Sequence, residues 1–251
     1  MTPALRTALA QRATLWGGWI TGPTMLGPEE FARAGYDYVG FDAQHSYLDD
    51  AAIAGMLRTV EQLPIATAVR LPNADPAPIG RVLDAGADAV IIALIETAEQ
   101  AAAAVSAARY PPAGVRSFGP LRPRLGVDPA GLESRAEVFA MIETPAALAD
   151  VERICAVPGL AGVYVGPVDL AISTGVPLSA ATTHPDARAA FARIRRAATQ
   201  AGVIAGIHAG TGTAGRDLAG LGYQMLTLTA ESQALRRGAA EHLAEASGKG
   251  P

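Results

Sequence analysis

Lysine is almost absent from the sequence. Of the 251 residues only Lys249, close to the carboxyl terminus, is a lysine, and the other permanently charged basic residues are arginines. Enzymes that form a Schiff base with their substrate or with pyridoxal phosphate need a lysine amine inside the pocket, and P-loop enzymes need one on the phosphates of a nucleotide. We therefore expect no Schiff-base lysine, no pyridoxal phosphate and no nucleotide at the functional site.

Cysteine is equally scarce. Cys155 is the only one in the chain, which excludes an internal disulfide framework and favours a reducing compartment. Its neighbours are alanine, valine and isoleucine, so we interpret it as a small buried hydrophobic residue and not as a nucleophile. The cytoplasm is the expected location.

Long apolar runs and clusters of basic charge are missing too. No run approaches the roughly 18 residues of a membrane-spanning helix, and residues 1–16 lack the apolar core of a signal peptide. The formal net charge is −4 and the basic residues form no run, which argues against a nucleic-acid-binding surface. We expect neither a membrane nor a nucleic acid among the partners.

Small aliphatic residues, in contrast, are plentiful. Half of the sequence is hydrophobic and only 5% is aromatic, which suits one large α/β domain or two small ones. A pattern of glycine, a turn residue and a run rich in valine and isoleucine recurs at residues 34–42, 85–94, 159–167 and 221–229. Each copy follows a helix-like segment, so we interpret its glycine as the cap that ends a helix before a buried parallel strand.

Further strands are expected at residues 15–21, 65–70, 138–143 and 203–208. About eight strands separated by alanine-rich helices, such as those at 97–109 and 185–201, predict an α/β fold of the (β/α)₈ barrel type. An open doubly wound sheet is the alternative, but the chain lacks its glycine fingerprint. We expect residues 1–251 to form one barrel domain, with a short amino-terminal surface helix and a flexible tail from Glu245 onward.

Two acidic residues follow consecutive expected strands. Glu143 closes the strand at 138–143, and Asp169 follows Gly166, Pro167 and Val168 after the next strand. Either acid alone is best interpreted as a helix N-cap. Together, at the carboxyl ends of neighbouring strands, they predict a divalent-cation site at the mouth of the barrel.

Four more polar residues are candidates for the same site. Arg70 ends a strand, where a buried arginine needs either a place in the pocket or an ion pair with Asp42 or Asp84. His45 follows the strand that ends near Asp42; a lone histidine there is commonly structural, but a carboxylate could orient it as a base. Asp84 lies at the expected carboxyl end of a helix, which is unfavourable for an acid and indicates a specific partner.

These residue types suit carbon–carbon bond chemistry on a 2-oxo acid. A cation on the two acids could chelate the keto and carboxylate oxygens and stabilise an enolate. Arg70 would add positive charge where the oxyanion develops, and His45 would transfer a proton directly or through water. The turn at Gly166, Pro167 and Val168 could offer backbone N–H groups to the substrate carboxylate, with proline contributing none.

Several segments resemble the signatures of the HpcH/HpaI aldolase family: FDAQHSYLD at 41–49, VR at 69–70, PPAGVRSFGP at 111–120, MIETPAAL at 141–148 and GVYVGPVDLAISTG at 162–175. The resemblance extends from about Gly17 to Ala230. It implies a (β/α)₈ TIM barrel of the phosphoenolpyruvate/pyruvate type. It also implies a metal-dependent class II pyruvate aldolase, a carbon–carbon lyase of the 4-hydroxy-2-oxoheptanedioate or 2-keto-3-deoxy-sugar-acid aldolase type.

The implied reaction is reversible retro-aldol cleavage of a 4-hydroxy-2-oxo acid. The products would be pyruvate, or an analogue such as hydroxypyruvate, and an aldehyde, formed through a metal-stabilised enolate. By the resemblance Glu143 and Asp169 would bind Mg²⁺, Mn²⁺ or Co²⁺, and Arg70 would contact the pyruvyl oxygen. His45, supported by Asp42 and Asp84, would form the acid/base relay. The family implies a homohexamer in which a neighbouring subunit helps to shape the aldehyde pocket.

The sequence departs from the family pattern at a few positions that bear on acceptor specificity. Ser46 stands where a glycine often follows the histidine, and Met141 stands where some members have glutamine. The last strand lacks the aspartate that many members carry just after it, although Glu231 is close. His208, at the end of the seventh strand, is either structural or part of the pocket.

Two other functions compete with the aldolase hypothesis. The first is a carbon–carbon lyase acting on acyl-CoA thioesters, of the citramalyl- or malyl-CoA type, which would need a basic surface for coenzyme A. The second is a catalytically silent barrel that serves as a binding module. The sequence does not determine the physiological aldehyde, the preferred metal, the stereochemistry or the pathway.

Overall fold

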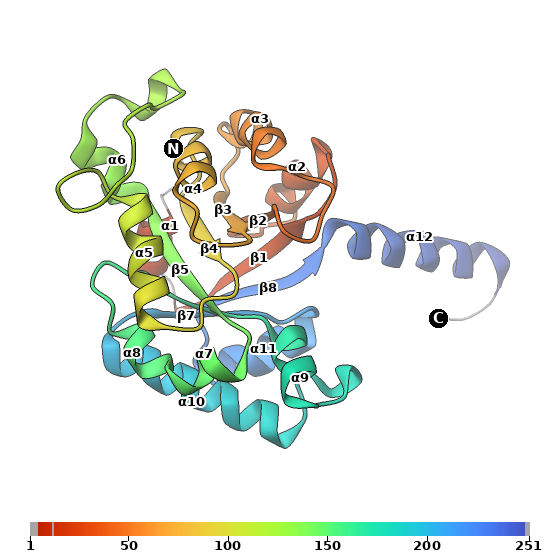
Figure 1. Cartoon of the computed structure of the whole chain (residues 1–251). Helices are drawn as coiled ribbons and strands as arrows, with labels where there is room; N and C mark the ends of the chain where they lie inside the picture. Colours follow the sequence, from red (N-terminus) through yellow and green to blue (C-terminus); the bar gives the residue numbers. More distant parts are fainter. Residues whose placement is uncertain (1–4, 12, 249–251) are drawn as a thin grey trace.

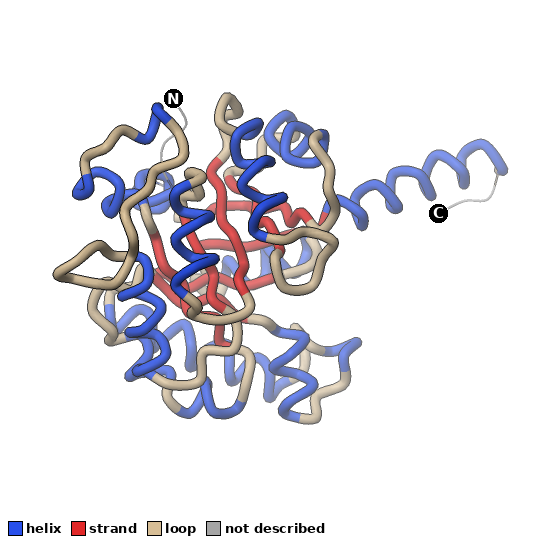
Figure 2. The backbone as a smooth tube through the Cα atoms, turned by 45° about the horizontal axis from the view of Figure 1, so that its top comes forward, coloured by secondary structure: helices blue, strands red, loops and turns tan. Residues whose placement is uncertain are grey.

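The computed structural model describes residues 5–11 and 13–248, so Lys249 lies outside the described residues. Eight parallel strands hydrogen-bond in sequence order and close into a barrel, with helices arranged around it (Figure 1, Figure 2). The predicted (β/α)₈ fold is confirmed. The strands are β1 (Leu15–Ile20), β2 (Tyr38–Asp42), β3 (Ala66–Leu71), β4 (Ala89–Ile92), β5 (Glu137–Ile142), β6 (Gly162–Val165), β7 (Ile204–His208) and β8 (Met225–Ala230).

Helices connect each strand to the next and cover the outside of the barrel (Figure 2). Those predicted at 97–109 and 185–201 correspond to α5 and α10. The helices are α1 (Leu5–Gln11), α2 (Leu26–Arg33), α3 (Asp50–Val60), α4 (Pro76–Asp84), α5 (Ala98–Ala108), α6 (Pro129–Arg135), α7 (Pro145–Ala149), α8 (Val151–Cys155), α9 (Pro167–Thr174), α10 (Pro185–Ala201), α11 (Gly212–Gly220) and α12 (Glu231–Ser247), with short 3₁₀ turns η1 (Pro123–Leu125) and η2 (Leu178–Ala180).

The first glycine of the repeated segment directly follows a helix C-cap in three of the four copies, at Gly35, Gly86 and Gly222, whereas Gly159 lies three residues beyond the C-cap of α8, Ala156. These four glycines have positive φ angles, 86° at Gly35, 103° at Gly86, 83° at Gly159 and 94° at Gly222. A residue with a Cβ atom rarely adopts this left-handed conformation. The repeat is therefore a helix-to-strand turn, and it brings the chain back to the amino end of the next strand.

Side chains alternate along the strands between the barrel interior and the surrounding helices. Outward side chains pack with the helices into the large aliphatic core. Inward side chains form a second cluster that fills the barrel, so the barrel is a packed core and not a pore. This inner cluster includes Leu15, Trp19, Tyr38, Ala66, Ala68, Ala89, Ile91, Phe139, Met141, Tyr164 and Met225.

Inward glycines make room for the aromatic rings of that cluster. A Cβ atom on Gly40 would lie 2.2 Å from Cζ3 of Trp19, and one on Gly17 would lie 2.0 Å from Cζ of Tyr38. Neither separation is compatible with van der Waals contact. The few aromatic residues of the chain are thus accommodated inside the barrel by glycines on the neighbouring strand.

Helix α1 differs from the expectation of a surface helix. Leu5 is fully buried and Ala8 is nearly so, and both pack with Leu15, the first residue of β1, and with other inward side chains. The helix therefore closes the amino-terminal end of the barrel. The sequence pattern could not show this, because a short apolar stripe does not say what it packs against.

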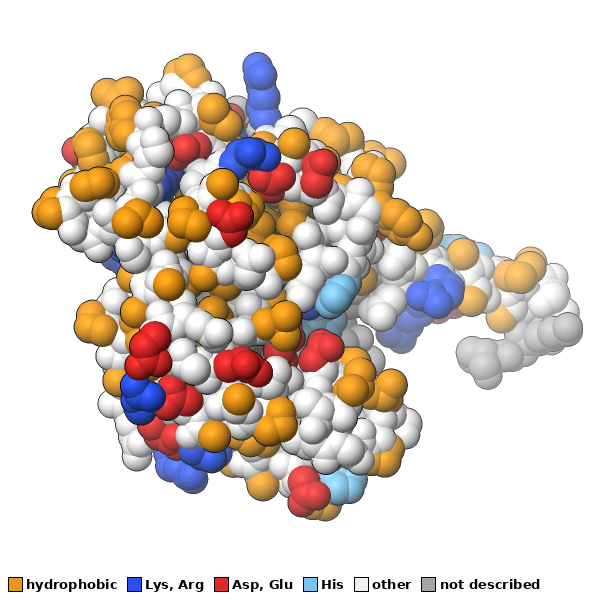
Figure 3. Space-filling model, viewed as in Figure 1, with side chains coloured by type: hydrophobic (Ala, Val, Ile, Leu, Met, Phe, Trp, Pro, Cys, Tyr) orange, Lys and Arg blue, Asp and Glu red, His pale blue; other side chains and the backbone are white. Residues whose placement is uncertain are grey.

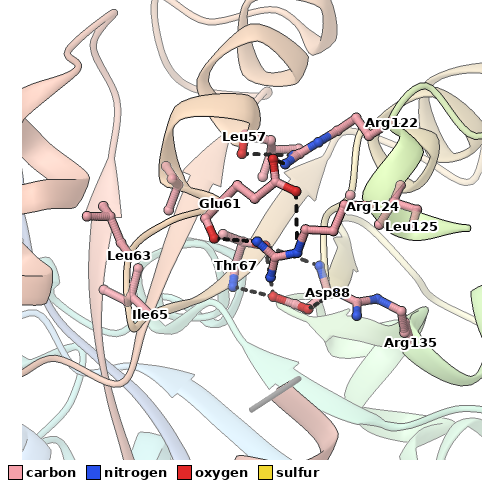
Figure 4. Close-up of a pocket in the computed structure, with 12 residues that line it drawn as sticks. Leu57, Glu61, Leu63, Ile65, Thr67, Asp88, Arg122, Arg124, Leu125 and Arg135 are labelled. Atoms are coloured by element: carbon pink, nitrogen blue, oxygen red, sulfur yellow. Dashed lines mark hydrogen bonds and ion pairs between the residues drawn. The ribbon is translucent and has the colours of Figure 1, made fainter. Parts of the chain in front are cut away.

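The long loop at residues 111–128 is held against the amino ends of the strands by arginines. Arg122 donates to the carbonyl oxygens of Leu57 at 3.0 Å and Ala85 at 2.9 Å, and it forms an ion pair with Glu61. Arg124 donates to the Glu61 carbonyl oxygen at 2.8 Å. These side chains line a small cavity of about 50 Å³ (Figure 4). Paired charges thus anchor this part of the loop.

Helix α12 leaves the body of the barrel (Figure 1). None of its residues is buried, and Leu235 and Leu243 are 75% and 70% exposed. Figure 3 shows apolar side chains along this projecting helix. The helix continues to Ser247, beyond the expected start of the tail at Glu245, and residues 249–251 lie outside the described part of the chain.

The setting of Cys155 agrees with its interpretation as a small buried hydrophobic residue. Cys155 is 1% exposed, and burial raises the pKa of its thiol to about 12, as befits a small hydrophobic residue. No helix of the described residues is long and apolar enough to cross a membrane.

The fold predicts that Gly40→Ala is destabilising. The added methyl group would displace the indole of Trp19, and overpacking of this kind costs about 1–3 kcal/mol. Urea unfolding, with the emission maximum of tryptophan as a second readout, measures the effect. Gly55→Ala is the matched control, because a Cβ atom there meets nothing within 4 Å and alanine favours a helix. Equal stability of Gly40→Ala and the wild type would contradict the packing argument.

Candidate active site

A cavity of about 200 Å³ lies at the carboxyl ends of the strands. In Figure 3 a histidine and several acidic side chains border a hollow near the centre of the viewed face. Most of the residues singled out from the sequence meet in this cavity. It is lined by Trp19, His45, Arg70, Met141, Tyr164, Gly166, Pro167, Val168, Asp169 and His208.

Arg70 is held on the floor of the cavity by Asp42. Its Nε donates to Oδ1 of Asp42 at 3.0 Å, and its Nη2 donates to Oδ2. The guanidinium also lies over the indole of Trp19, 5.6 Å from the ring centroid, and the indole Nε1 donates to Asp42 Oδ2 at 3.3 Å. Burial acts to raise the pKa of Asp42, but the bonds and charge of Arg70 bring it below its usual value. The buried pair therefore keeps a positive charge in a fixed orientation.

Asp42 does not orient the imidazole of His45, which corrects the expectation from the sequence. Its Oδ1 accepts hydrogen bonds from the backbone N–H groups of Gln44 at 2.9 Å and His45 at 3.1 Å. The imidazole is exposed and has no hydrogen bond among the described residues. Asp42 therefore positions the loop that carries His45 and leaves the imidazole free to meet a substrate.

Glu143 is buried at the edge of the cavity, directly after β5. Its Oε1 accepts a hydrogen bond from the backbone N–H of Leu94 at 2.8 Å. Leu94 has a φ of 55°, an unfavourable conformation for a residue with a side chain. This strained turn fixes one carboxylate oxygen and leaves the other available for a ligand. The sequence offered no signal for it, since such φ angles normally indicate glycine.

The second acid lies near Glu143 and has the same charge. Burial raises the pKa of Glu143, the Leu94 N–H lowers it, the charge of Asp169 raises it, and Arg70 and His45 lower it. The four predicted residues are thus close enough to interact electrostatically. Asp169 is half-buried in the first turn of α9 and forms no hydrogen bond or ion pair within the described chain. Two carboxylates without a counter-cation fit the ligand set of a divalent ion.

No group of three or more His, Cys, Asp or Glu side chains is arranged to hold a metal within the described residues. A cation here would therefore have two protein carboxylates, with water and substrate oxygens completing its shell. Mg²⁺ commonly binds proteins in this way. The residues fit such an ion.

The turn before α9 has a narrower role than expected. The N–H of Gly166 is already donated to the carbonyl oxygen of Ile142 at 3.3 Å. Val168 lies in the first turn of α9, where backbone N–H groups have no partner inside the helix. Gly166 contributes space, since a Cβ atom there would lie 2.7 Å from Oε2 of Glu143 and 2.8 Å from Cε of Met141.

Asp84 lies outside the cavity, which corrects its predicted place in an acid/base relay within the chain. It is the last residue of α4, at the amino ends of the strands, whereas the cavity is at their carboxyl ends. Its Oδ1 accepts a hydrogen bond from Nη2 of Arg116 at 2.6 Å. Burial raises the pKa of Asp84, and Arg116 lowers it. The specific partner expected for this acid is therefore Arg116, in the long loop.

Two of the departures from the family pattern have structural explanations. The hydroxyl of Ser46 donates to the carbonyl oxygen of Asp42 and accepts from the N–H of Leu48 at 2.9 Å, so it stabilises the His45 loop. Oε1 of Glu231 accepts from the backbone N–H groups of Thr21 at 2.8 Å and Gly22 at 2.7 Å. Glu231 therefore connects the start of α12 to the loop after β1.

The other two departures, Met141 and His208, line the cavity itself. Sequence reasoning missed two further wall residues, Trp19 and Tyr164. The hydroxyl of Tyr164 bonds Oγ1 of Thr227 at 2.7 Å, and burial raises its pKa to about 12, so it stays protonated. Trp19 and Tyr164 both occupy inward-facing positions near the carboxyl ends of their strands, β1 and β6. These positions are the sequence signal that could have identified them.

The sequence model of HpcH/HpaI aldolase/citrate lyase matches residues 16–236. The chain belongs to this family. The resemblance inferred from the motifs is therefore confirmed over most of the chain.

Named relatives agree with this assignment. A hydroxypyruvate/pyruvate aldolase from Rhizorhabdus wittichii is 35% identical over 245 residues, which cover 96% of this chain and 98% of that protein. A 4-hydroxy-2-oxovalerate aldolase from Rhodococcus jostii is 35% identical over 210 residues, covering 80% and 81%. A crystal structure of an HpcH/HpaI aldolase/citrate lyase family protein from Burkholderia cenocepacia superposes with a TM-score of 0.89 at 33% identity, covering 98% and 100%. This HpcH/HpaI protein is a carbon–carbon lyase of the aldolase type.

The raised pKa of Glu143 predicts that its charge destabilises the metal-free protein. A carboxyl group whose pKa is higher in the folded state than in the unfolded chain costs stability when ionised, and the cost disappears as the pH falls through the folded value. Glu143→Gln should therefore raise the melting temperature in EDTA at pH 8 by about 2–4 °C per kcal/mol relieved. The difference should shrink at pH 5.

The exposed Glu29→Gln is the control for this experiment; losing a charge in the first turn of α2 should lower the melting temperature slightly, and by a similar amount at both pH values. In the presence of Mg²⁺ the Glu143→Gln variant should lose the stabilisation that the ion gives the wild type. A Glu143→Gln variant that melts below the wild type in EDTA at pH 8 would contradict the electrostatic argument.

Proposed function

We propose that this protein is a metal-dependent class II aldolase that cleaves a 4-hydroxy-2-oxo acid reversibly to pyruvate, or to hydroxypyruvate, and an aldehyde. The observation that carries the proposal is the meeting of Asp169, Arg70 and His45 in the lining of one cavity, with Oε2 of Glu143 beside Gly166 of the same lining. The relatives named hydroxypyruvate/pyruvate aldolase and 4-hydroxy-2-oxovalerate aldolase support the same substrate class.

In this proposal Glu143 and Asp169 hold a divalent cation, Mg²⁺, Mn²⁺ or Co²⁺. When bound, the cation supplies the positive charge that stabilises an enolate and orients the 2-oxo acid. The N–H of Leu94, which lies in the strained turn, keeps Oε1 of Glu143 in place, and Gly166 leaves room for Oε2. The absence of a lysine from the cavity lining agrees with a metal in place of a Schiff base.

The remaining residues position the substrate and move the proton. Arg70, held in place by Asp42, donates to the keto oxygen, where negative charge develops. The N–H of Val168, at the positive end of α9, binds the substrate carboxylate. His45 removes the proton from the carbon next to the keto group, or from the 4-hydroxyl group in the cleavage direction. Its imidazole is suited to this because it is exposed and forms no hydrogen bond with the described residues.

A retro-aldol screen tests the function. Hydroxy-oxo acids of increasing chain length are supplied, and pyruvate release is coupled to lactate dehydrogenase. Treatment with EDTA should lower kcat/KM by about 100-fold or more, because the charge supplied by the cation stabilises the transition state by several kcal/mol. Adding back Mg²⁺, Mn²⁺ or Co²⁺ should restore activity, and borohydride with pyruvate should leave the protein mass unchanged.

A matched pair of variants sharpens the test. Asp169→Asn should remove the rescue by metal, whereas Asp186→Asn, an exposed acid in the first turn of α10, should behave as the wild type. Covalent trapping by borohydride, or full activity in EDTA, would refute the mechanism. Activity on malyl-CoA without retro-aldol activity would favour the acyl-CoA lyase, and activity on neither would leave the binding module.

The proposed partners are small molecules and further copies of the chain, with the hexamer of the family as the proposed assembly and the cytoplasm as the proposed location. Helix α12 supports the assembly, because it contacts its own chain only near its first residues and none of its residues is buried. A surface cavity of about 570 Å³ at its base is lined by Leu26, Phe31, Tyr36 and Leu235. Exposed apolar surface of this kind is typical of subunit contacts.

The double variant Leu235→Asp/Leu243→Asp should therefore dissociate the oligomer. Two buried charges would remove the apolar contact that α12 makes with another subunit. Multi-angle light scattering measures the mass of the particle. Leu178→Asp, at a leucine that is also exposed but lies on the barrel body, is the control and should leave the mass unchanged. A monomeric wild type would overturn the proposed assembly.

A further inference from the structure

His208 is a polar side chain in the cavity that the reaction described above does not use. It is the last residue of β7 and points inward, where its ring meets that of Trp19 edge to face at a centroid distance of 5.5 Å and an interplanar angle of 85°. The ring is half-buried and lines the cavity. Neither of its nitrogens forms a hydrogen bond with the described residues.

The polar groups around His208 already have partners, or a role in the proposed reaction in which the remaining N–H groups of Arg70 donate to the keto oxygen. Trp19 Nε1 and the guanidinium of Arg70 both donate to Asp42, and the hydroxyl of Tyr164 bonds Thr227. Burial, reinforced by the charge of Arg70, lowers the pKa of His208 to about 4. The imidazole is thus neutral near pH 7, with one N–H donor and one nitrogen acceptor. It is the uncommitted hydrogen-bonding group on the side of the cavity formed by β7 and β1.

The proposed function, on which this inference rests, determines how a 2-oxo acid is oriented in the cavity. A 2-oxo acid whose carboxylate and keto oxygens face Glu143, Asp169 and the start of α9 directs its next carbon away from them. In the closed barrel β5 lies opposite β1, and His208 at the end of β7 packs against Trp19 of β1. The carbon next to the keto group therefore faces Trp19 and His208, and a substituent on that carbon comes within reach of the imidazole.

We propose that His208 hydrogen-bonds a hydroxyl group on the carbon adjacent to the keto carbon. It thereby determines how well the enzyme uses 3-hydroxy-2-oxo acids, such as hydroxypyruvate, relative to pyruvate. The other residues of this wall are Trp19, Tyr164 and Met141, and none of them has a free hydrogen-bond donor. Without the imidazole, the substrate hydroxyl would lose its hydrogen bonds to water and gain none from the protein. A site that hydrogen-bonds a substrate hydroxyl discriminates against loss of that bond far better than an apolar pocket does.

The test compares kcat/KM for hydroxypyruvate and for pyruvate with the same acceptor, acetaldehyde, in the metal-loaded enzyme. In His208→Leu, which removes both hydrogen-bonding atoms at similar size, the hydroxypyruvate/pyruvate ratio should fall about tenfold, the scale of one hydrogen bond. His208→Gln, which retains a donor and an acceptor, should keep most of the wild-type ratio. Thermal melting of each variant verifies that it is folded.

The outcomes separate this inference from the function on which it rests. Two results would overturn the role of His208 and leave the aldolase function intact. One is an unchanged hydroxypyruvate/pyruvate ratio in an active His208→Leu variant, and the other is an equal loss of kcat/KM with hydroxypyruvate and with pyruvate. A wild type that turns over neither donor removes the proposed function, and the inference with it. If His208→Leu does not fold, a crystal of the wild type with hydroxypyruvate decides: a C3 hydroxyl oxygen within 3.2 Å of an imidazole nitrogen supports the inference, and a greater distance refutes it.

Discussion

The buried ion pair between Asp42 and Arg70 is the interaction on which the site depends. An arginine on an inward position of a barrel strand is costly to desolvate, and a forked carboxylate on the neighbouring strand offsets that cost. The register of β2 and β3 places the two residues side by side. The same carboxylate accepts from the indole of Trp19 and from the backbone of the His45 loop. This one pair therefore orients the guanidinium of Arg70, the indole of Trp19 and the loop that carries His45.

The acids of the chain differ in their partners, and this difference organises the electrostatics. Asp42 and Asp84 have arginine partners. Among the described residues, Glu143 and Asp169 have no cationic partner within hydrogen-bonding distance, and the charge of Asp169 raises the pKa of Glu143. Two neighbouring negative charges in a partly buried site are unfavourable unless a cation joins them. The protein holds them in place by connecting them to rigid elements, one through the strained Leu94 turn and the other in the first turn of α9.

The packing of the barrel interior links this chemistry to the fold. Because neighbouring glycines make room for them, large rings can stand inside the barrel directly below the cavity. Tyr38, Thr227 and Tyr164 satisfy one another's hydroxyl groups there, at 2.8 Å and 2.7 Å. The floor of the site is consequently rigid and has no unpaired hydroxyl, which leaves the free polar groups to the rim. Helix α12 is the exception to this compactness, since it exposes its apolar residues instead of covering its own barrel.

The amino-acid sequence by itself determined the barrel, because runs rich in valine and isoleucine, each following a glycine turn and a helix-like segment, are local properties of the chain. It also predicted that Arg70, Glu143 and Asp169 lie at one end of the barrel, because parallel strands deliver their last residues to one edge. Only the tertiary structure decided that Asp42 pairs with Arg70 while Asp84 faces the opposite end, and that His208 enters the cavity. These outcomes depend on which side chains of distant segments come within hydrogen-bonding distance when the barrel closes, and sequence spacing carries no measure of that distance.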